Sequence, residues 1–233
     1  MLGIASVLLG PADHIHWKQC QACDNIFTNG YFSDEALKLL FGRIRPDQVV
    51  AKDVERNRVI PARMIEKVLP FKDNGLWGDI GFGNGPLSMP ADESVSDTPA
   101  LDLRETTVIP MKLLGFDCRV ADICDLELDR KAAVISMADV LEHTPFPKTC
   151  LEAAHRLLEK DGVLLVSMPN ADAFVWRMST NQKRNPYWGE IEHDHNFGRK
   201  RLYALLEETG FKPKAYGVSE RDRMCMEVVA TKV

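Results

Sequence analysis

Three glycines at alternate positions follow a short apolar run in the first half of the chain. Residues 76–85 read L-W-G-D-I-G-F-G-N-G, and a second short apolar run, residues 100–103, carries Asp102 near its end. In a parallel α/β sheet, a glycine-rich turn after the first strand lets the backbone approach a nucleotide, and an acid about 20 residues later binds the ribose hydroxyls. The spacing from Gly81 to Asp102 therefore predicts such a sheet and a nucleotide-like ligand.

Details of the same loop disfavour a dinucleotide. A dehydrogenase fingerprint uses a third glycine to pack the helix against the strand, and Pro86 stands at that position. Pro90 shortens the helix whose N-terminus would face a pyrophosphate, and the carboxylate of Asp79 would repel one. That acid suits a ligand with an ammonium or sulfonium charge. A nicotinamide-dependent oxidoreductase is the alternative that these residues disfavour.

Strand-like and helix-like segments alternate through the rest of the chain. Residues 133–137 and 163–167 are apolar runs of strand length, and residues 147–159 between them have a helical apolar stripe. Further helices are expected over residues 107–114 and around residues 202–206. Repeated strand–helix units predict a parallel sheet with right-handed crossovers.

Further motifs extend the pattern in a fixed order. After D-I-G-F-G-N-G come A-D-I at residues 121–123, D-V-L-E-H at residues 139–143 and E-H-D-H-N-F at residues 192–197. This set resembles the class I S-adenosylmethionine-dependent methyltransferases over roughly residues 70–233, and D-V-L-E-H is typical of a branch that acts on small molecules. The resemblance implies an α/β fold: a Rossmann-like, doubly wound, mostly parallel seven-stranded sheet with a final antiparallel strand, assigned to residues 226–230.

The resemblance also implies where the cofactor S-adenosylmethionine binds. Asp79 and the glycine loop are expected to contact its methionine part, Asp102 its ribose, and Asp122 its adenine. Leu103 is expected to pack on the adenine ring, and Asp139 to flank the cofactor. The predicted cofactor-binding set is Asp79, Gly81, Phe82, Gly83, Gly85, Asp102, Leu103, Asp122, Ile123 and Asp139.

Catalytic candidates lie where open α/β sheets bind ligands, at the carboxyl ends of strands. His143, beside Glu142, is predicted to position the acceptor or remove its proton, or else to be a structural histidine bonded to backbone. His193 is a candidate base, since similar proteins have a histidine there. His193 and His195 would share a face of a strand, and with Glu142, His143 and Asp194 they would form a base or a divalent-metal site. The alternative is a pair of exposed loop histidines.

The acceptor pocket is predicted from residues near the same edge. Tyr187 and Trp188 are large amphipathic side chains that would line its wall or, alternatively, cover the core. Asn170 would bind an acceptor hydroxyl or simply end a strand. With His195, these residues complete the predicted substrate-binding set.

The N-terminal segment carries Cys20-Gln21-Ala22-Cys23, which has the spacing of a zinc knuckle. The segment resembles the second half of a zinc module found in many sugar-modifying methyltransferases, although the first knuckle is absent. His14 and His16 would have to complete a zinc site with Cys20 and Cys23. The alternative is a degenerate module with free cysteines.

Three parts of the chain are expected. Residues 1–30 form an N-terminal extension, residues 31–70 a helical lead or lid, and residues 71–233 the S-adenosylmethionine-binding domain. Ser33 is expected to cap one helix of the lead, and Pro61 to lie in the first turn of the next.

Bulk properties exclude several other classes of protein. A net charge of −5 over 233 residues gives no basic face for nucleic acid. No run approaches the ~18 apolar residues of a membrane span, and the apolar run of residues 2–9 lacks the basic flank of a signal peptide. Six cysteines without a paired framework fit a reducing compartment. The protein is predicted to be cytoplasmic and to bind a small-molecule acceptor, but neither nucleic acid nor a membrane. A homodimer is left open.

The predicted function is S-adenosylmethionine-dependent methyl transfer to a hydroxyl or amine of a small molecule. A sugar or nucleotide-sugar is favoured by the resemblance of the N-terminal segment. A catalytically silent, cofactor-binding scaffold or regulatory protein is the main alternative, and the oxidoreductase is a further one.

Overall fold

The computed structural model describes residues 4–6, 16–41, 49–53, 58–95, 99–128 and 130–233. The strands are β1 (Ile4–Ser6), β2 (Trp17–Cys20), β3 (Ile26–Thr28), β4 (Trp77–Ile80), β5 (Ala100–Asp102), β6 (Cys118–Val120), β7 (Ala132–Ala138), β8 (Leu158–Pro169), β9 (His195–Asn196), β10 (Phe211–Val218) and β11 (Cys225–Lys232). The helices are α1 (Asp34–Phe41), α3 (Val59–Val68), α4 (Ser88–Val95), α5 (Glu105–Leu113), α6 (Pro147–Leu157), α7 (Phe174–Asn181) and α8 (Arg199–Glu208), with 3-10 helices η1 (Ile123–Asp125), η2 (Leu141–His143) and η3 (Pro186–Trp188).

The central sheet has seven strands in the order β10-β11-β8-β7-β4-β5-β6. The strands β8, β7, β4, β5 and β6, which are successive neighbours in the sheet, run parallel to one another. In contrast, β11 is antiparallel to both of its neighbours, β8 and β10. The predicted Rossmann-like, mostly parallel seven-stranded sheet with a final antiparallel strand is confirmed. β11 contains the residues 226–230 assigned to that strand.

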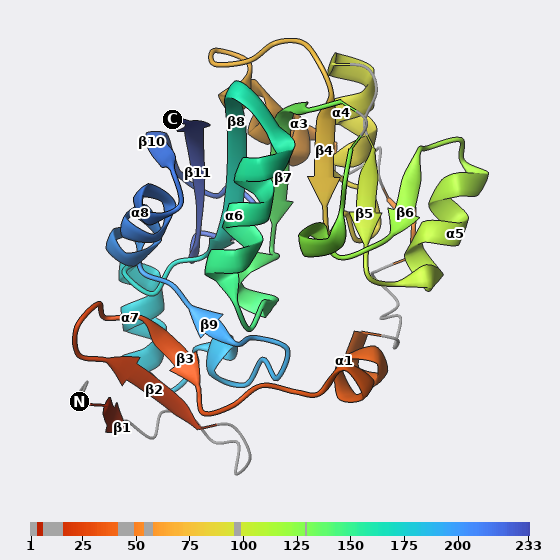
Figure 1. The fold of residues 1–233 in the computed structure, drawn as a ribbon. Helices are drawn as coiled ribbons and strands as arrows, with labels where there is room; N and C mark the ends of the chain where they lie inside the picture. The colour runs from red at the N-terminus through yellow and green to blue at the C-terminus, as the bar shows by residue number, and fades with distance from the viewer. Residues whose placement is uncertain (1–3, 7–15, 42–48, 54–57, 96–98, 129) are drawn as a thin grey trace.

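Helices cover both faces of this sheet (Figure 1). The side chains of β7 alternate: Ile135 and Met137 pack with α6 and α8, and Val134 packs with α3. This is the period-two pattern of a strand buried on both sides. α3 therefore belongs to the core of the domain through Met64, Ile65 and Val68, although the sequence places it in a helical lead.

A second, four-stranded sheet has the order β1-β2-β3-β9 and was not predicted from the sequence. Its last strand comes from the C-terminal half of the chain, because Ile26 pairs with Asn196 and Phe27 with His195. Figure 1 shows this sheet and α1 beyond the carboxyl ends of the parallel strands. The N-terminal segment thus joins the edge of the domain where ligands of open α/β sheets bind.

Local details follow the expected chemistry in most places. Ser33 Oγ accepts a hydrogen bond from the backbone N of Ala36 at 3.4 Å, as a helix cap does. α4, which contains Pro90, has eight residues and is the short helix expected after the glycine loop. β8 begins at Leu158 rather than near Val163, so the predicted helix before it ends two residues early. Within the described residues, no helix is both long enough and apolar enough to span a bilayer.

Candidate active site

The glycine loop leaves β4 in a conformation that favours glycine. Gly81, Gly83 and Gly85 have φ of 65°, 61° and 83°. A Cβ at Gly81 would lie 2.7 Å from Cγ2 of Val140, and one at Gly85 would lie 2.8 Å from Cε of Met111. A Cβ at Gly83 would have Nη2 of Arg104, 3.8 Å away, as its nearest heavy atom beyond the chain neighbours. The outer two glycines therefore allow close packing, and the middle one leaves room beside the backbone.

Asp102, at the end of β5, is tied to this loop. Its Oδ2 accepts a hydrogen bond from the backbone N of Gly83 at 3.0 Å. Its Oδ1 accepts from the backbone N and Nε of Arg104, both at 2.9 Å, and Nη2 of Arg104 lies 3.0 Å from Oδ2. The carboxylate predicted to bind ribose is thus covered by a guanidinium that the sequence analysis did not single out. A ribose would have to displace Arg104 or share Asp102 with it.

Asp79 is buried beneath the loop. Its Oδ2 accepts from Ser88 Oγ at 2.5 Å and its Oδ1 from Ser136 Oγ at 2.6 Å. Ser136 Oγ in turn accepts from the indole nitrogen of Trp77 at 2.8 Å. Burial raises the pKa of Asp79 to about 6, although the two serine hydroxyls oppose this effect. Its predicted contact with the methionine part of the cofactor stays a prediction.

The residues predicted to surround adenine lie at the ends of the next strands. Asp122 is exposed, and its carboxylate accepts from the backbone N of Cys124 at 2.8 Å as the cap of η1. Ile123 is buried, whereas Leu103 is 59% exposed and its side chain is available to pack on a ring. Phe82 is buried in the core beside α5, so only its backbone could face the cofactor.

Asp139, the first residue of D-V-L-E-H, has φ of 55° and follows β7 directly. Its two carboxylate oxygens pair with the guanidinium of Arg221, with 2.7 Å between Oδ1 and Nη2. Nη2 of Arg221 also donates to Ser167 Oγ at 3.1 Å. Arg221 lies 82 residues further along the chain, and no sequence motif marked it.

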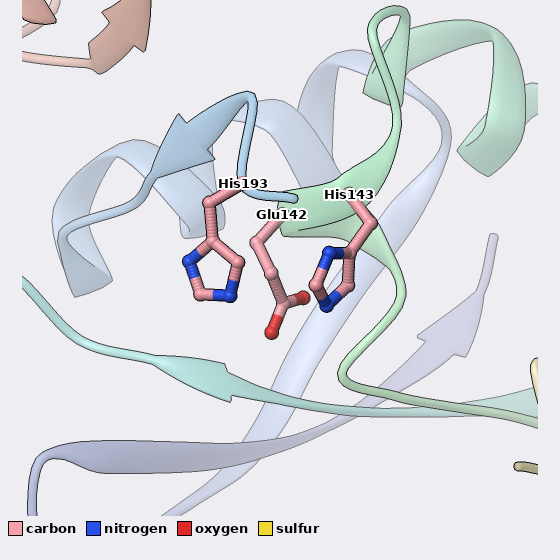
Figure 2. Close-up of side chains that lie close together, drawn as sticks. All are labelled: Glu142, His143 and His193. Atoms are coloured by element: carbon pink, nitrogen blue, oxygen red, sulfur yellow. The ribbon is translucent and has the colours of Figure 1, made fainter. Parts of the chain in front are cut away.

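Glu142, His143 and His193 come together at this edge of the sheet. One ligand atom from each of these residues lies within 4.8 Å of the other two. The two imidazole rings are in edge-to-face contact, with centroids 4.6 Å apart at 85°, and Figure 2 shows the Glu142 side chain beside both of them. Glu142 is 1% exposed. Burial raises its pKa well above the usual range of a carboxyl, and the charge of nearby Asp139 adds to this effect.

Backbone and aromatic contacts hold the two histidines. His143 Nδ1 lies 2.8 Å from the carbonyl oxygen of Glu192. Because a carbonyl only accepts, Nδ1 carries the hydrogen and donates it, which leaves the lone pair of the neutral ring on Nε2. The His193 ring stacks on Tyr187 with centroids 5.8 Å apart, and Tyr187 stacks on Trp176 at 5.0 Å. All three members of the cluster are residues that the sequence predicts as catalytic candidates.

His195 and Asp194 are placed elsewhere. His195 Nδ1 accepts from Nδ2 of Asn25 at 3.1 Å, and its Nε2 lies 3.4 Å from the carbonyl oxygen of Pro145. Burial lowers the pKa of His195, consistent with a neutral ring held between these partners. The Asp194 carboxylate accepts from Thr28 Oγ1 at 3.4 Å, and burial raises its pKa to about 6. Both residues connect the small sheet to the domain.

The other residues predicted to bind the acceptor make internal hydrogen bonds. The side-chain oxygen of Asn170 accepts from the backbone N two residues later at 2.9 Å. The Tyr187 hydroxyl donates to Asp222 at 2.8 Å, and the Trp188 indole donates to Thr180 at 3.1 Å. Their role toward an acceptor stays a prediction, and each also has the packing role named as its alternative.

The cysteine pair lies at the hairpin that joins β2 to β3, with Cys20 at the end of β2 and Cys23 in the turn. Cys20 and Cys23 are free and partly buried, and the backbone N of Cys20 donates to the carbonyl of Asn25 at 2.8 Å. His16 is exposed, and His14 lies outside the described residues. Across the described ranges, no His, Asp or Glu joins the two thiols in a group of three ligands. The structure therefore does not support the predicted zinc site.

Comparisons with known proteins agree with this geometry. The family model described as a methyltransferase domain matches residues 54–215. An uncharacterized protein of Methanocaldococcus jannaschii is 24% identical over 160 residues, which cover 68% of this chain and 75% of that protein.

Two solved structures with bound S-adenosylhomocysteine share the fold. The 1,6-didemethyltoxoflavin-N1-methyltransferase of Burkholderia thailandensis has a TM-score of 0.64 at 16% identity, covering 90% of this chain and 96% of its own. The N-methyltransferase NodS of Bradyrhizobium japonicum has a TM-score of 0.60 at 14% identity, covering 85% and 97%. At these identities the likeness concerns the fold.

Proposed function

The chain belongs to the methyltransferase domain family and is an S-adenosylmethionine-dependent methyltransferase, and we propose that it methylates a hydroxyl or amine of a small molecule. Within that class we propose a sugar or nucleotide-sugar. The resemblance of the N-terminal segment to modules of sugar-modifying methyltransferases supports this narrower choice.

One contact supports the proposal above all others. A Cβ on Gly81, in the glycine loop, would meet Val140, in the turn that carries Glu142 and His143. The strands that lead into these two turns are neighbours, with Ile80 paired to Met137. The turn of the acid and histidine cluster therefore abuts the loop predicted to hold the methyl donor.

This arrangement suits the chemistry of methyl transfer. The acceptor atom attacks the methyl carbon in line with the bond to sulfur, so that alignment and exclusion of water are the main tasks of the protein. A hydroxyl or a protonated amine must also lose a proton. The lone pair on Nε2 of His143 and the ring of His193 are the groups we propose to position the acceptor and take that proton.

Thermal denaturation with S-adenosylhomocysteine, S-adenosylmethionine and NAD in parallel tests the cofactor site. At about a hundred times the dissociation constant a ligand adds about 2.7 kcal/mol of stability, or about 5–10 °C for a chain of this size. We expect this rise with the two adenosyl ligands alone. A rise only with NAD would contradict the assignment.

Turnover of a panel of sugars, nucleotide-sugars, amines and phenols then tests the acceptor class. His193→Gln should lower kcat for the accepted compound while the rise in Tm with S-adenosylhomocysteine persists. His155→Gln, on α6, is the matched control and should keep both. Cofactor binding without turnover on any acceptor would favour the catalytically silent scaffold.

A further inference from the structure

Glu142 has an environment that is unfavourable for a carboxylate. Its side chain is 1% exposed, and neither of its oxygens accepts a hydrogen bond from any described residue. Buried carboxylates are ordinarily hydrogen-bonded, paired with a cation or bound to a metal, because the loss of hydration otherwise costs several kcal/mol. The nearest guanidinium described above, that of Arg221, is already paired with Asp139. A cation bound beside Glu142 would supply the partner that an ionised carboxylate at this position lacks.

The two imidazoles are arranged around this carboxylate. In Figure 2 a ring nitrogen of His143 and one of His193 are turned toward Glu142. The other nitrogen of His143 donates to the carbonyl oxygen of Glu192 at 2.8 Å. Histidines that ligate metals usually make this outer hydrogen bond, which fixes the tautomer and points the free lone pair at the ion.

We propose that Glu142, His143 and His193 bind one divalent transition-metal ion, which coordinates a hydroxyl oxygen of the methyl acceptor. Two imidazole nitrogens and one carboxylate oxygen suit Zn²⁺, Mn²⁺, Fe²⁺ or Co²⁺ better than Mg²⁺ or Ca²⁺, which prefer oxygen ligands. Three protein ligands leave coordination positions open for a substrate.

The spacing of the three side chains is compatible with this ion. The candidate ligand atoms lie within 4.8 Å of one another, whereas ligands of one tetrahedral ion at about 2.1 Å lie about 3.4 Å apart. The difference is at most about 1.4 Å, and we expect rotations about the side-chain bonds to close it. We therefore expect the cluster to contract when the metal binds.

A metal ion at this site favours a hydroxyl compound over an amine as the methyl acceptor. This inference rests on the proposed function. With the ion bound, the lone pairs of His143 and His193 are used as ligands and no longer accept the acceptor's proton. Coordination instead lowers the pKa of the bound hydroxyl, whose proton passes to solvent. The oxygen then forms its bond to the methyl carbon, and the carbon–sulfur bond breaks with its electron pair remaining on sulfur. The products are a methyl ether, S-adenosylhomocysteine and one proton, and no oxidant or reductant takes part.

A Mn²⁺ titration of the full-length, EDTA-treated protein, followed by the electron paramagnetic resonance of free Mn²⁺, tests the site. Mn²⁺ is a suitable probe because the thiols of Cys20 and Cys23 favour softer metals. We expect one ion per chain, with affinity at least about tenfold weaker in Glu142→Gln and in His193→Asn. His155→Asn, which changes a histidine outside the cluster, should bind Mn²⁺ like the unchanged protein.

S-Adenosylhomocysteine binding in the same samples separates the two proposals and reports folding of each variant. Absence of stoichiometric Mn²⁺ binding, or equal binding by folded Glu142→Gln and His193→Asn, would overturn the metal site and leave the methyltransferase proposal standing. Binding of Mn²⁺ without binding of S-adenosylhomocysteine would instead overturn the link to a methyl acceptor. Loss of O-methylation on EDTA treatment, with recovery on adding Mn²⁺, would support both.

Discussion

Replacing Asp79 with asparagine tests how the fold holds a carboxylate beneath the glycine loop. Asp79 is 2% exposed, and Ser88 and Ser136 each donate a hydrogen bond to it. Burial, the largest influence, raises its pKa from 3.8 to about 6, with a smaller contribution from the charge of Asp102. An ionised carboxylate at this position is therefore unfavourable in the ligand-free protein.

The raised pKa fixes the sign and the pH range of the effect. Between pH 3.8 and about 6 the unfolded chain has lost the proton of Asp79 and the folded protein still holds it, so stability falls as the pH rises. The difference between the two pKa values corresponds to about 3 kcal/mol in the free energy of unfolding. About 1.4 kcal/mol of this loss in the free energy of unfolding occurs between pH 5 and 8. The loss is nearly complete at about pH 7.

Urea unfolding of the ligand-free protein and of Asp79→Asn at pH 5, 6, 7 and 8 measures this loss. From pH 5 to pH 8 the free energy of unfolding of the variant should rise by about 1.4 kcal/mol relative to that of the unchanged protein, because asparagine does not titrate. Any pH-independent change in hydrogen bonding cancels in the comparison. Ser88→Ala removes a donor that lowers the pKa of Asp79, so it should increase the pH dependence. A difference between Asp79→Asn and the unchanged protein that stays constant within about 0.3 kcal/mol would refute this reasoning.

Three further variants have defined outcomes. Asp102→Ala should weaken S-adenosylhomocysteine binding by about 1–3 kcal/mol in calorimetry, since it removes a charged acceptor; an unchanged affinity would place the ribose elsewhere. Trp17→Ala should lower the free energy of urea unfolding by about 3–5 kcal/mol, because its ring is 1% exposed and packs on Trp188. A loss below about 1 kcal/mol would mean that the small sheet unfolds separately. Cys20→Ser with Cys23→Ser should change thermal stability by less than about 0.5 kcal/mol, and a larger loss would indicate a bound metal.

Much of the central fold could be predicted because its signals are local. The glycines at positions 81, 83 and 85 have the positive φ that their residue type favours, and apolar runs mark β7 and β8. The start of β8 was less predictable. Asp161 and Gly162 have the composition of a turn, and Asp161 has φ of 59°, but β8 extends across them because Leu158 pairs with Ala132 before the regular pairing resumes at Val163.

The site was predictable only in part. The sequence identified Glu142 and His143 as candidates because D-V-L-E-H follows a strand, and His193 because similar methyltransferases have a histidine there. It grouped His195 with them on the expectation of a longer strand, whereas β9 begins only at His195. Arg104 and Arg221 carry no motif, so their pairing with the acids of the site could not be read from residue types.

The class of fold, the order of the parallel strands along the chain and the loop that marks a cofactor site could thus be inferred from residue types and their spacing. These depend on backbone preferences of single residues and on hydrophobic periods of two and 3.6 residues. The contacts between distant residues became visible only in the folded chain: His193 beside Glu142, Arg221 on Asp139, and Phe27 opposite His195. Such contacts depend on how loops at the ends of different strands pack together, and no local preference records that arrangement.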